Sequence, residues 1–283
     1  MSSTNDYQNR RVAFLTQHGK ERLIKTPLET ALGCQLIHTS GYDTDLLGTF
    51  TRDKIRPGSQ LQAAKKKASI GMSLIGASVG IASEGAFGMD PFSGFIPWNT
   101  ELLVWIDHDL GIEVVGVAQG PAQSLHKTIR TVDELEAFAK TASFPEHHLV
   151  LRPENENHPD IIKGIDTPAA LMNAFHTSKQ KSTNGSVFIE NDLRAHCNPT
   201  RQGVILKAAN NLIQKLQSAC PNCSTLGYWI KAQKAGLPCA VCGRQTQLPI
   251  SETWHCSACK YEEDKRLRID HLAPASHCDF CNP

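Results

Sequence analysis

Eight of the ten cysteines in this sequence lie beyond residue 218, arranged as four Cys-x-x-Cys pairs. The pairs are Cys220/Cys223, Cys239/Cys242, Cys256/Cys259 and Cys278/Cys281. A Cys-x-x-Cys turn is short enough for both sulfurs to bind one ion, and zinc prefers four thiolates in a tetrahedron. Two pairs therefore complete one closed site, and the sequence predicts two structural Zn²⁺ ions in a zinc-ribbon module.

The spacing of the pairs leaves open which of them share an ion. The gaps between successive pairs are 15, 13 and 18 residues. The first and third gaps fall in the range usual for zinc sites built from two such pairs. We therefore expect two consecutive ribbons, with the first two pairs on one ion and the last two on the other. The main alternative is a nested arrangement, in which the inner two pairs share one ion and the outer two share the other.

Disulfide bonds are a weaker interpretation of these cysteines. Residues 1–10 are polar and contain no apolar core, so we expect no targeting segment and a reduced, cytoplasmic chain. The longest weakly apolar run, residues 70–82, is too short and too rich in Gly and Ser to cross a bilayer. We expect no membrane association.

Length and charge bound the domain organisation and the partners. A chain of 283 residues accommodates one sizeable domain, expected over residues 10–218, and a small module over residues 219–283. The net charge is +1, and the small module has seven Lys or Arg against six Asp or Glu. Each zinc ion with four thiolates adds about −2, so the loaded module is acidic. Nucleic-acid binding is not favoured by this charge, whereas a protein partner remains possible.

The larger region alternates between strand and helix patterns. Residues 11–16 and 34–38 are typical of strands, and the Thr26-x-x-Glu29 capping box between them predicts a helix that starts or restarts there. Further strands are expected at 78–83, 101–107, 111–118, 148–152 and 186–190, and helices at 59–75, 131–142, 167–176 and 199–217. The pair of strands around residues 108–110 reads as a hairpin. We therefore expect an α/β fold with a mixed sheet and flanking helices.

Acidic residues follow one of the predicted strands. Glu84 and Asp90 come after the run 78–83 and are separated by glycines that permit close approach to the backbone. Carboxylate oxygens are suitable ligands for Mg²⁺ that contacts a phosphate. The alternative is a turn with an exposed glutamate.

A basic loop precedes the helix expected from residue 59. Arg52, Lys54 and Arg56 lead to Ser59, a candidate N-cap. Cations beside a helix N-terminus favour an anion. A solvated basic loop is the alternative.

The segment 190–201 combines two acids, two arginines and a histidine with the start of a helix. Asn198 is the expected N-cap, followed by Pro199 at the first helical position. Arg194, His196 and Arg201 in this setting indicate phosphate or carboxylate recognition. The alternative is a salt-bridge network that joins Glu190 and Asp192 to the two arginines.

Four segments resemble an uncharacterised bacterial domain family. They are GYDTDLLGTFTRDKIRPGS, IASEGAFG, ENDLRAHCNPTR and the Cys-rich tail that ends in CDFCNP. Together they cover nearly the whole chain. The resemblance implies no established activity.

A second, fainter resemblance is to the inosine-triphosphate pyrophosphatase-like fold. Thr16-Gln17-His18-Gly19-Lys20 is similar to that fold's Thr-Gly-Asn turn and phosphate-binding lysine, with Lys20 in the lysine's place, although the glycine and asparagine of the turn are missing. Glu84 stands where that fold has an acidic residue, with Ser83 in place of a second acid, and His196 and Arg201 loosely match its Ser-His-Arg. The resemblance implies Mg²⁺-dependent removal of pyrophosphate from non-standard purine nucleoside triphosphates.

The leading functional hypothesis is therefore a Mg²⁺-assisted phosphoanhydride hydrolase that acts on a nucleotide-like substrate. Lys20, Arg194 and Arg201 would hold phosphates. Glu84 and Asp90 would bind the metal, and His196 would contact the substrate or relay a proton. The competing hypothesis is a non-enzymatic adaptor whose zinc ribbons bind a protein or nucleic acid.

Overall fold

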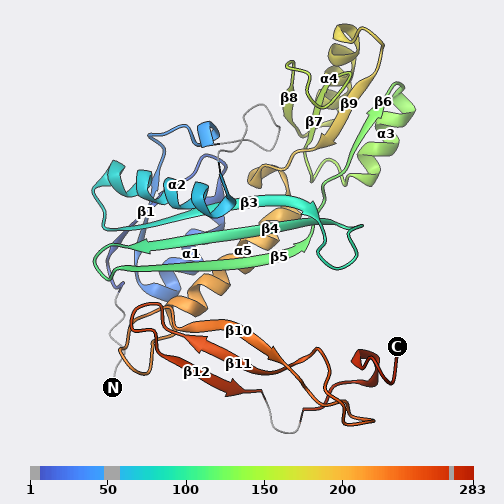
Figure 1. The fold of residues 1–283 in the computed structure, drawn as a ribbon. Helices are drawn as coiled ribbons and strands as arrows, with labels where there is room; N and C mark the ends of the chain where they lie inside the picture. Colours follow the sequence, from blue (N-terminus) through green and yellow to red (C-terminus); the bar gives the residue numbers. More distant parts are fainter. Residues whose placement is uncertain (1–6, 48–57, 268–270) are drawn as a thin grey trace. The chain divides into compact units, whose positions relative to one another are not determined.

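The computed structural model describes residues 7–47, 58–267 and 271–283 (Figure 1). The chain forms two compact units. The first consists of Met1–Asp109 and Val115–Ile213, and the second of Leu110–Val114 and Gln214–Pro283. Arg52, Lys54 and Arg56, in which we expected an anion site, lie outside the described residues.

A five-stranded mixed sheet is the centre of the first unit. Its order is β2 (Gln35–Thr39), β1 (Arg11–Leu15), β3 (Val79–Met89), β4 (Pro97–Asp107) and β5 (Ile112–Pro121). β1 is parallel to both β2 and β3, whereas β3 and β4 are antiparallel. The predicted α/β class with a mixed sheet is confirmed.

Helices cover both faces of this sheet because successive strand residues point to opposite sides. α2 (Gln60–Ile75) packs on one face, where Ala64 and Ala68 contact Ala82 of β3 and Val104 of β4. α1 (Lys20–Leu32) and α5 (Pro199–Leu216) lie on the other face (Figure 1).

α1 is one continuous helix, although the Thr26-Pro27 capping box allowed a separate start there. Ile24, Leu28 and Leu32 are spaced four residues apart and are all buried. They form one apolar stripe, which keeps both halves of the helix against the sheet despite Pro27. The other predicted caps are confirmed: the side chains of Ser59, Thr131 and Thr167 accept hydrogen bonds from the first turns of α2, α3 and α4.

A second sheet in the first unit was not anticipated. Its order is β6 (His126–Ile129), β9 (Val187–Asn191), β7 (Leu149–Pro153) and β8 (Ile162–Ile165), with all neighbours antiparallel. α3 (Val132–Thr141) and α4 (Pro168–Lys181) bury Leu135, Phe138, Leu171 and Phe175 in a core of its own. Strand patterns at 148–152 and 186–190 were correct, but local periodicity does not state to which sheet a strand belongs.

The second unit is built on a small antiparallel sheet of β10 (Trp229–Ala235), β11 (Pro249–His255) and β12 (Glu262–Arg266). Its small core consists of Tyr228, Trp254 and Tyr261 packed around two cysteines. Short 3-10 turns complete the fold at Thr44–Leu47, Ala195–Cys197 and Ala275–His277. Among the described residues, no helix combines the length and hydropathy that crossing a membrane requires.

Gly116 of β5 tests the packing of α5 on the sheet. A Cβ atom there would lie 2.5 Å from the Ala208 carbonyl oxygen and 2.5 Å from Leu212 Cβ. We predict that Gly116→Ala lowers the free energy of unfolding by about 1–3 kcal/mol, because the helix must move away.

The matched control is Gly203→Ala, in α5 itself, where a Cβ meets nothing within 4 Å. This change should raise the free energy of unfolding by about 0.5–1 kcal/mol, because alanine is the better helix former. Urea unfolding of both variants measures the two effects, and equal stability of the two would contradict the packing described.

Candidate active site and zinc centres

The order β2-β1-β3 creates a topological switch point between β1 and β3, and the region beyond the carboxyl ends of these two strands is termed the crevice. The chain leaves β1 through α1 toward β2 on one side, and it returns from β2 through α2 to β3 on the other side. At such a switch point, open α/β sheets bind ligands outside the carboxyl ends of their strands. Phe14 pairs with Ile81, so Ser83 lies level with Thr16, the first residue after β1. The loop Thr16–Gly19 and the middle of β3 therefore meet at this edge.

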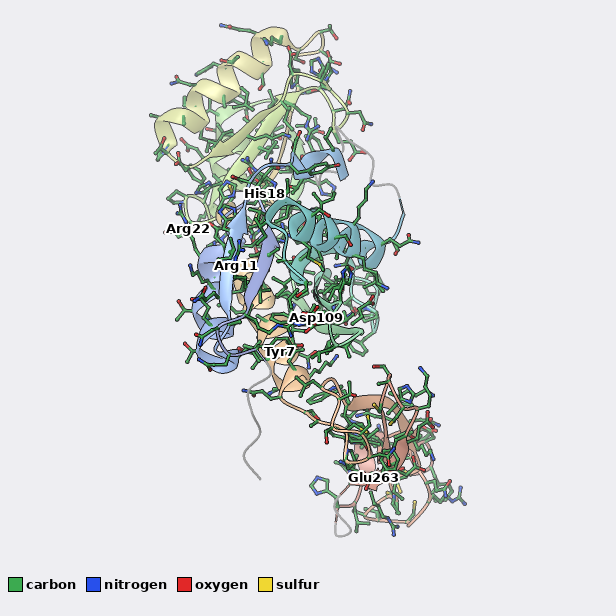
Figure 2. All side chains as sticks on the ribbon, turned by 90° about the vertical axis from the view of Figure 1, so that its left-hand side faces the viewer. Tyr7, Arg11, His18, Arg22, Asp109 and Glu263 are labelled. Atoms are coloured by element: carbon green, nitrogen blue, oxygen red, sulfur yellow. The ribbon has the colours of Figure 1, made fainter. Side chains whose placement is uncertain are left out.

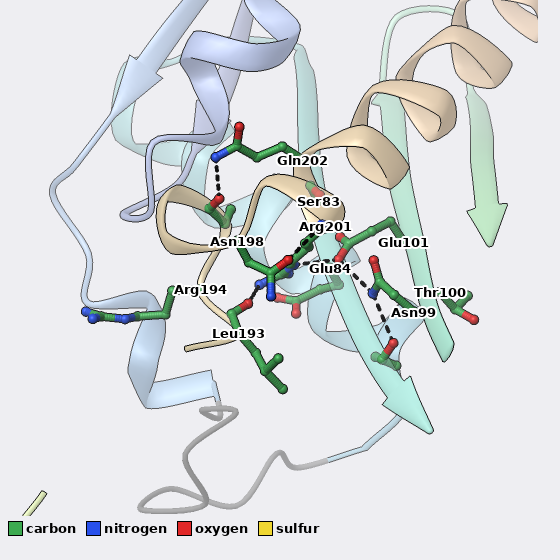
Figure 3. Close-up of polar contacts among 12 residues, drawn as sticks. Ser83, Glu84, Asn99, Thr100, Glu101, Leu193, Arg194, Asn198, Arg201 and Gln202 are labelled. Carbon is green, nitrogen blue, oxygen red and sulfur yellow. Dashed lines mark hydrogen bonds and ion pairs between the residues drawn. The ribbon is translucent and has the colours of Figure 1, made fainter. Parts of the chain in front are cut away.

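A buried cluster of charges lies beside this edge (Figure 3). Lys20 Nζ donates to Ser83 Oγ at 3.1 Å and to the Ser83 carbonyl oxygen at 3.2 Å, and it lies 3.8 Å from Glu101 Oε2. Arg201 Nε donates to Glu101 Oε1 at 2.7 Å. The side chains of Glu101 and Arg201 are 0% and 1% exposed. One carboxylate thus lies between two cations, and the three groups together carry one net positive charge.

The surroundings of this cluster require a glycine in β3. Gly85 pairs with Glu101, so both positions face the same side of the sheet. A Cβ atom at Gly85 would collide with Glu101 Oε1 and with Arg201 Nη2. Asn99 Nδ2 donates to Glu101 Oε1 at 3.2 Å and to the Ala86 carbonyl oxygen at 3.2 Å. The glycine leaves the space that the ion pair occupies.

Burial changes the proton affinities in the cluster. It lowers the pKa of Lys20 from 10.5 to about 8, an effect that the nearby Glu101 carboxylate opposes. Burial alone would raise the pKa of Glu101, but Arg201 and Lys20 outweigh it, and the pKa of this carboxyl group falls below its usual value. Glu101 is therefore ionised at neutral pH, and Lys20 gains a neutral fraction that exposed lysines lack.

The segment before α5 brings His196 to the same crevice. The rings of His18 and His196 stack with centroids 5.8 Å apart, which joins the β1–α1 loop to this segment. Burial, and after it the nearby Arg194 guanidinium, lowers the pKa of His196. Its imidazole is therefore neutral at pH 7 and can accept a proton. The side chain of His18 is labelled in Figure 2.

Arg194 binds Asp192, whereas Arg201 binds Glu101. Its Nε and Nη2 donate to the Asp192 carboxylate at 3.0 and 2.6 Å, and the Asp192 side chain is completely buried. Figure 3 shows Arg194 extending away from the Arg201–Glu101 pair. As predicted, Asn198 caps α5, since its Oδ1 accepts from the Arg201 backbone N–H at 3.0 Å.

The salt-bridge alternative for this segment holds in part. Asp192 does pair with Arg194, but Glu190 pairs with Arg152 at 2.6 Å and Arg201 pairs with Glu101. Glu101 is the residue that sequence reasoning missed. It begins the run ELLVWID, and by alternation it shares a face with the core residues Leu103 and Trp105. The sequence did show a glutamate at a position that alternation assigns to the core side of the strand. A buried charge of this kind needs a partner of opposite charge.

The structure does not bring Glu84 and Asp90 together. They lie six positions apart on one extended segment, which corresponds to about 20 Å. Glu84 points to the α2 face, opposite Ser83 and Gly85, and forms an ion pair with Lys67. Lys67 belongs to a run of three consecutive lysines in α2.

Asp90 stabilises the turn between β3 and β4. Its carboxylate accepts hydrogen bonds from the backbone N–H groups of Ser93, Ile96, Phe92 and Phe95 and from the Ser93 hydroxyl. These bonds, led by the one from the Ser93 backbone, hold the pKa of Asp90 far below its usual range. A carboxylate with so many donors does not fit the role of a magnesium ligand.

The eight cysteines form two four-sulfur clusters. One contains Cys220, Cys223, Cys256 and Cys259, and the other Cys239, Cys242, Cys278 and Cys281. The first Cys-x-x-Cys pair thus joins the third, and the second joins the fourth. Both the consecutive and the nested arrangements expected from spacing are wrong.

The direction of the strands explains this interleaving. The first pair precedes β10, the second follows β10, the third follows β11, and the fourth lies beyond β12. Neighbouring strands run antiparallel, so each strand carries the chain to the opposite end of the sheet. Successive pairs therefore alternate between the two ends, and pairs that are not adjacent in sequence meet.

The sulfur geometry fits zinc. Sγ–Sγ distances are 3.7 and 3.6 Å in the first cluster and 3.9 and 3.6 Å in the second. A tetrahedron with Zn–S bonds of about 2.3 Å has edges of about 3.8 Å. A disulfide would bring two sulfurs to about 2.05 Å. Two four-cysteine clusters with this spacing are consistent with two zinc sites, and their four ligands leave no position for a substrate.

Comparison with protein families gives a match over most of the chain. Residues 67–283 match the model of a family described as a domain of unknown function (DUF6671), and this range includes both cysteine clusters. The match agrees with the expected uncharacterised domain family for three of the four resembling segments, whereas the segment at residues 41–59 lies outside the matched range. No curated protein matches the chain.

The low pKa of Lys20 predicts how stability varies with pH. Its value of about 8 in the folded protein is below its ordinary 10.5, so the unfolded chain binds more protons between these two pH values. The free energy of unfolding should therefore rise from pH 8 to 10.5, by up to about 3 kcal/mol for this group. Lys20→Met should lack this rise, whereas the exposed-lysine control Lys25→Met should keep it. Urea unfolding across this pH range decides, and identical curves for Lys20→Met and the parent would refute the assignment.

The interleaved clusters predict which cysteine substitutions act together. The parent chain should hold two Zn²⁺ ions. Cys220→Ser with Cys256→Ser should remove one ion, because both residues belong to one cluster. Cys220→Ser with Cys239→Ser should remove both.

Zinc content by elemental analysis of the purified variants measures this. In the consecutive arrangement Cys220 and Cys239 would share one ion, so the variant with both residues changed to serine would keep the other ion. Retention of one ion by that variant would overturn the pairing described.

Proposed function

The chain belongs to the DUF6671 family, and we propose that it is a hydrolase that cleaves a phosphoanhydride bond in a nucleotide-like substrate. The observation that carries the proposal is the crevice at β1 and β3, where Thr16–Gly19, Ser83 and His196 meet. The resemblance of the Thr16–Lys20 turn to that of the inosine-triphosphate pyrophosphatase-like fold supports the same location.

Backbone and cationic groups at the crevice suit phosphate oxygens. α1 begins after Gly19, whose φ of 70° is left-handed, and no side chain from the described residues caps this end of the helix. The N–H groups of a helix start and its partial positive charge stabilise a phosphate. Lys20 and Arg201 lie beneath, and with Glu101 they add one positive charge in a region without water to screen it. In this proposal these two residues attract the phosphates, and Arg194 contacts them from the crevice wall.

Magnesium has one remaining candidate ligand, Glu84. Mg²⁺ is commonly held by one or two carboxylates together with substrate phosphates. A bound ion would replace the Lys67 ammonium beside Glu84 on the α2 face, so the phosphates would have to extend past the end of β1 to contact it. Asp90 has no part in the proposal.

His196 is the proposed general base. Its neutral imidazole would take a proton from a water molecule as the water oxygen bonds to phosphorus and the bond to the bridging anhydride oxygen breaks. The departing phosphate or pyrophosphate carries away the electron pair of that bond. His18, stacked on His196, would keep the base in position.

A second candidate function, the zinc-ribbon adaptor, is favoured by apolar side chains near the second cysteine cluster. Val241, Leu272 and Phe280 are 74%, 52% and 59% exposed, and all three lie within a few residues of its cysteines or beside them through the Cys239–Ala273 bridge. Exposed apolar groups gathered on a small module are typical of a protein-binding surface. The adaptor would need no chemistry at the crevice.

Hydrolysis of a nucleotide panel with MgCl₂ tests the proposal. We expect release of phosphate or pyrophosphate from at least one nucleoside di- or triphosphate, inosine triphosphate included. His196→Ala should lower kcat by about 10²-fold or more, and Glu84→Gln should raise the Mg²⁺ concentration needed for half activity. Because the pKa of His196 is lowered, activity should fall on acidification at a lower pH than it would with an ordinary histidine.

His176→Ala, an exposed histidine of α4, and Arg22→Met, an exposed arginine of α1, are the controls and should leave kcat unchanged. Absence of turnover across the panel by the zinc-loaded parent, or turnover unaffected by both His196→Ala and Glu84→Gln, would refute the hydrolase and leave the adaptor.

A further inference from the structure

A cavity of about 300 Å³ lies in the part of the first unit built on the four-stranded sheet. It is open to solvent on one side and is lined by the end of β7, the loop that leads to β8, and the last turns of α4. Its lining residues are Pro153, Pro159, Asp160, Ile161, Ile162, Thr177, Ser178 and Lys181. None of them belongs to the crevice at β1 and β3, and the hydrolase proposal uses none of them.

Ser178 is one of the lining residues, and its hydroxyl lies buried in the wall without a hydrogen-bond partner among the described residues. The residue is 1% exposed. A buried hydroxyl without a partner costs about 1–3 kcal/mol. A ligand with an acceptor at this point would remove that cost.

An ion pair belongs to the lining of the same cavity. Lys181 Nζ and Asp160 Oδ2 lie 2.9 Å apart, and about half of each side chain is exposed. They are the only charged residues of the lining. A ligand with a single charge would pair with one of them and leave the other without its partner. A ligand with both charges on neighbouring atoms can separate the pair and satisfy both groups.

The spacing along α4 places the two donors together. Ser178 and Lys181 are three residues apart, so their side chains are neighbours on one helix face. One carboxylate can therefore accept from the Ser178 hydroxyl and the Lys181 ammonium at once. The Asp160 carboxylate is then free to bind an ammonium, close to the end of α4 where the helix dipole also favours positive charge.

The remaining walls are apolar and limit the size of the ligand. Pro153, Pro159, Ile161 and Ile162 face the cavity without side-chain polar groups. With a volume of about 30 Å³ for each water-sized group, the cavity holds on the order of ten non-hydrogen atoms. We propose that this cavity binds a free α-amino acid with an apolar side chain, its carboxylate on Ser178 and Lys181, its ammonium on Asp160 and its side chain against the prolines and isoleucines.

Calorimetric titration of the full zinc-loaded chain tests this site. The probes are L-leucine and L-valine, with glycine as the ligand without a side chain. 3-Methylbutylamine carries the ammonium without the carboxylate, and 4-methylpentanoate carries the carboxylate without the ammonium. We expect leucine or valine to bind at least tenfold more tightly than glycine and than either singly charged compound.

Two variants and one control locate the binding. Lys181→Met should weaken leucine or valine binding at least tenfold, and Ser178→Ala about five- to tenfold. Ser178→Ala removes a hydroxyl without a partner, so its thermal stability should equal or exceed that of the parent. Lys179→Met is the control, because Lys179 Nζ donates to the Arg130 carbonyl oxygen outside the cavity, and it should bind as the parent does.

Three results would overturn the proposal. They are no heat of binding with leucine or valine up to 10 mM, equal affinity for a singly charged compound, and unchanged affinity in both Ser178→Ala and Lys181→Met. Loss of nucleotide hydrolysis does not bear on any of them, so this inference and the proposed function fail separately.

Discussion

The Glu101 carboxylate joins the parts of the first unit that lie around the crevice. From β4 it binds Arg201, near the start of α5, and lies beside Lys20, the first residue of α1. Lys20 in turn binds Ser83 in β3. Removing one member of a buried ion pair costs about 3–5 kcal/mol, because the other charge stays buried without a partner. Because separating these charges is so unfavourable, the cluster keeps α1, α5, β3 and β4 in one arrangement. Gly85 leaves the space that the Glu101 and Arg201 side chains occupy.

Polar residues near the crevice are of two kinds, which differ in burial. Lys20, Arg201 and Glu101 are buried and satisfy one another, so they set the local charge rather than offering free contacts. His196, Arg194 and the loop after β1 are more accessible, and the functional proposal assigns them the direct contacts. Glu84 and Lys67 form a further pair on the α2 face of the same sheet. The neighbouring residues Ser83 and Glu84 of β3 therefore contact lysines on opposite faces of the sheet.

The second unit depends on a different constraint. Its sheet has three short strands, and beyond Ser218 the described residues bury few apolar side chains, namely Tyr228, Leu237, Ala273 and four cysteines. So little buried apolar surface stabilises a fold only weakly, and in small domains a structural metal supplies the missing free energy. The interleaved clusters lie one at each end of the sheet, and each joins two pairs separated by two strands. Zinc at both ends would therefore hold every strand of this unit in place.

The sequence by itself determined most helices and strands of the first unit and the eight cysteines that form the two clusters. Caps at Ser59, Thr131, Thr167 and Asn198, the mixed sheet and the eight cysteines all follow from local patterns, because each depends on residues a few positions apart. Tertiary structure decided what depends on distant residues. It decided that the first cysteine pair meets the third, since strand reversal and not spacing sets which ends coincide. It also placed Glu84 on the α2 face, used Asp90 within a turn, and gave Arg201 a partner one hundred positions away in Glu101. Such contacts form only when packing brings distant segments together, and no local pattern records which segments those will be.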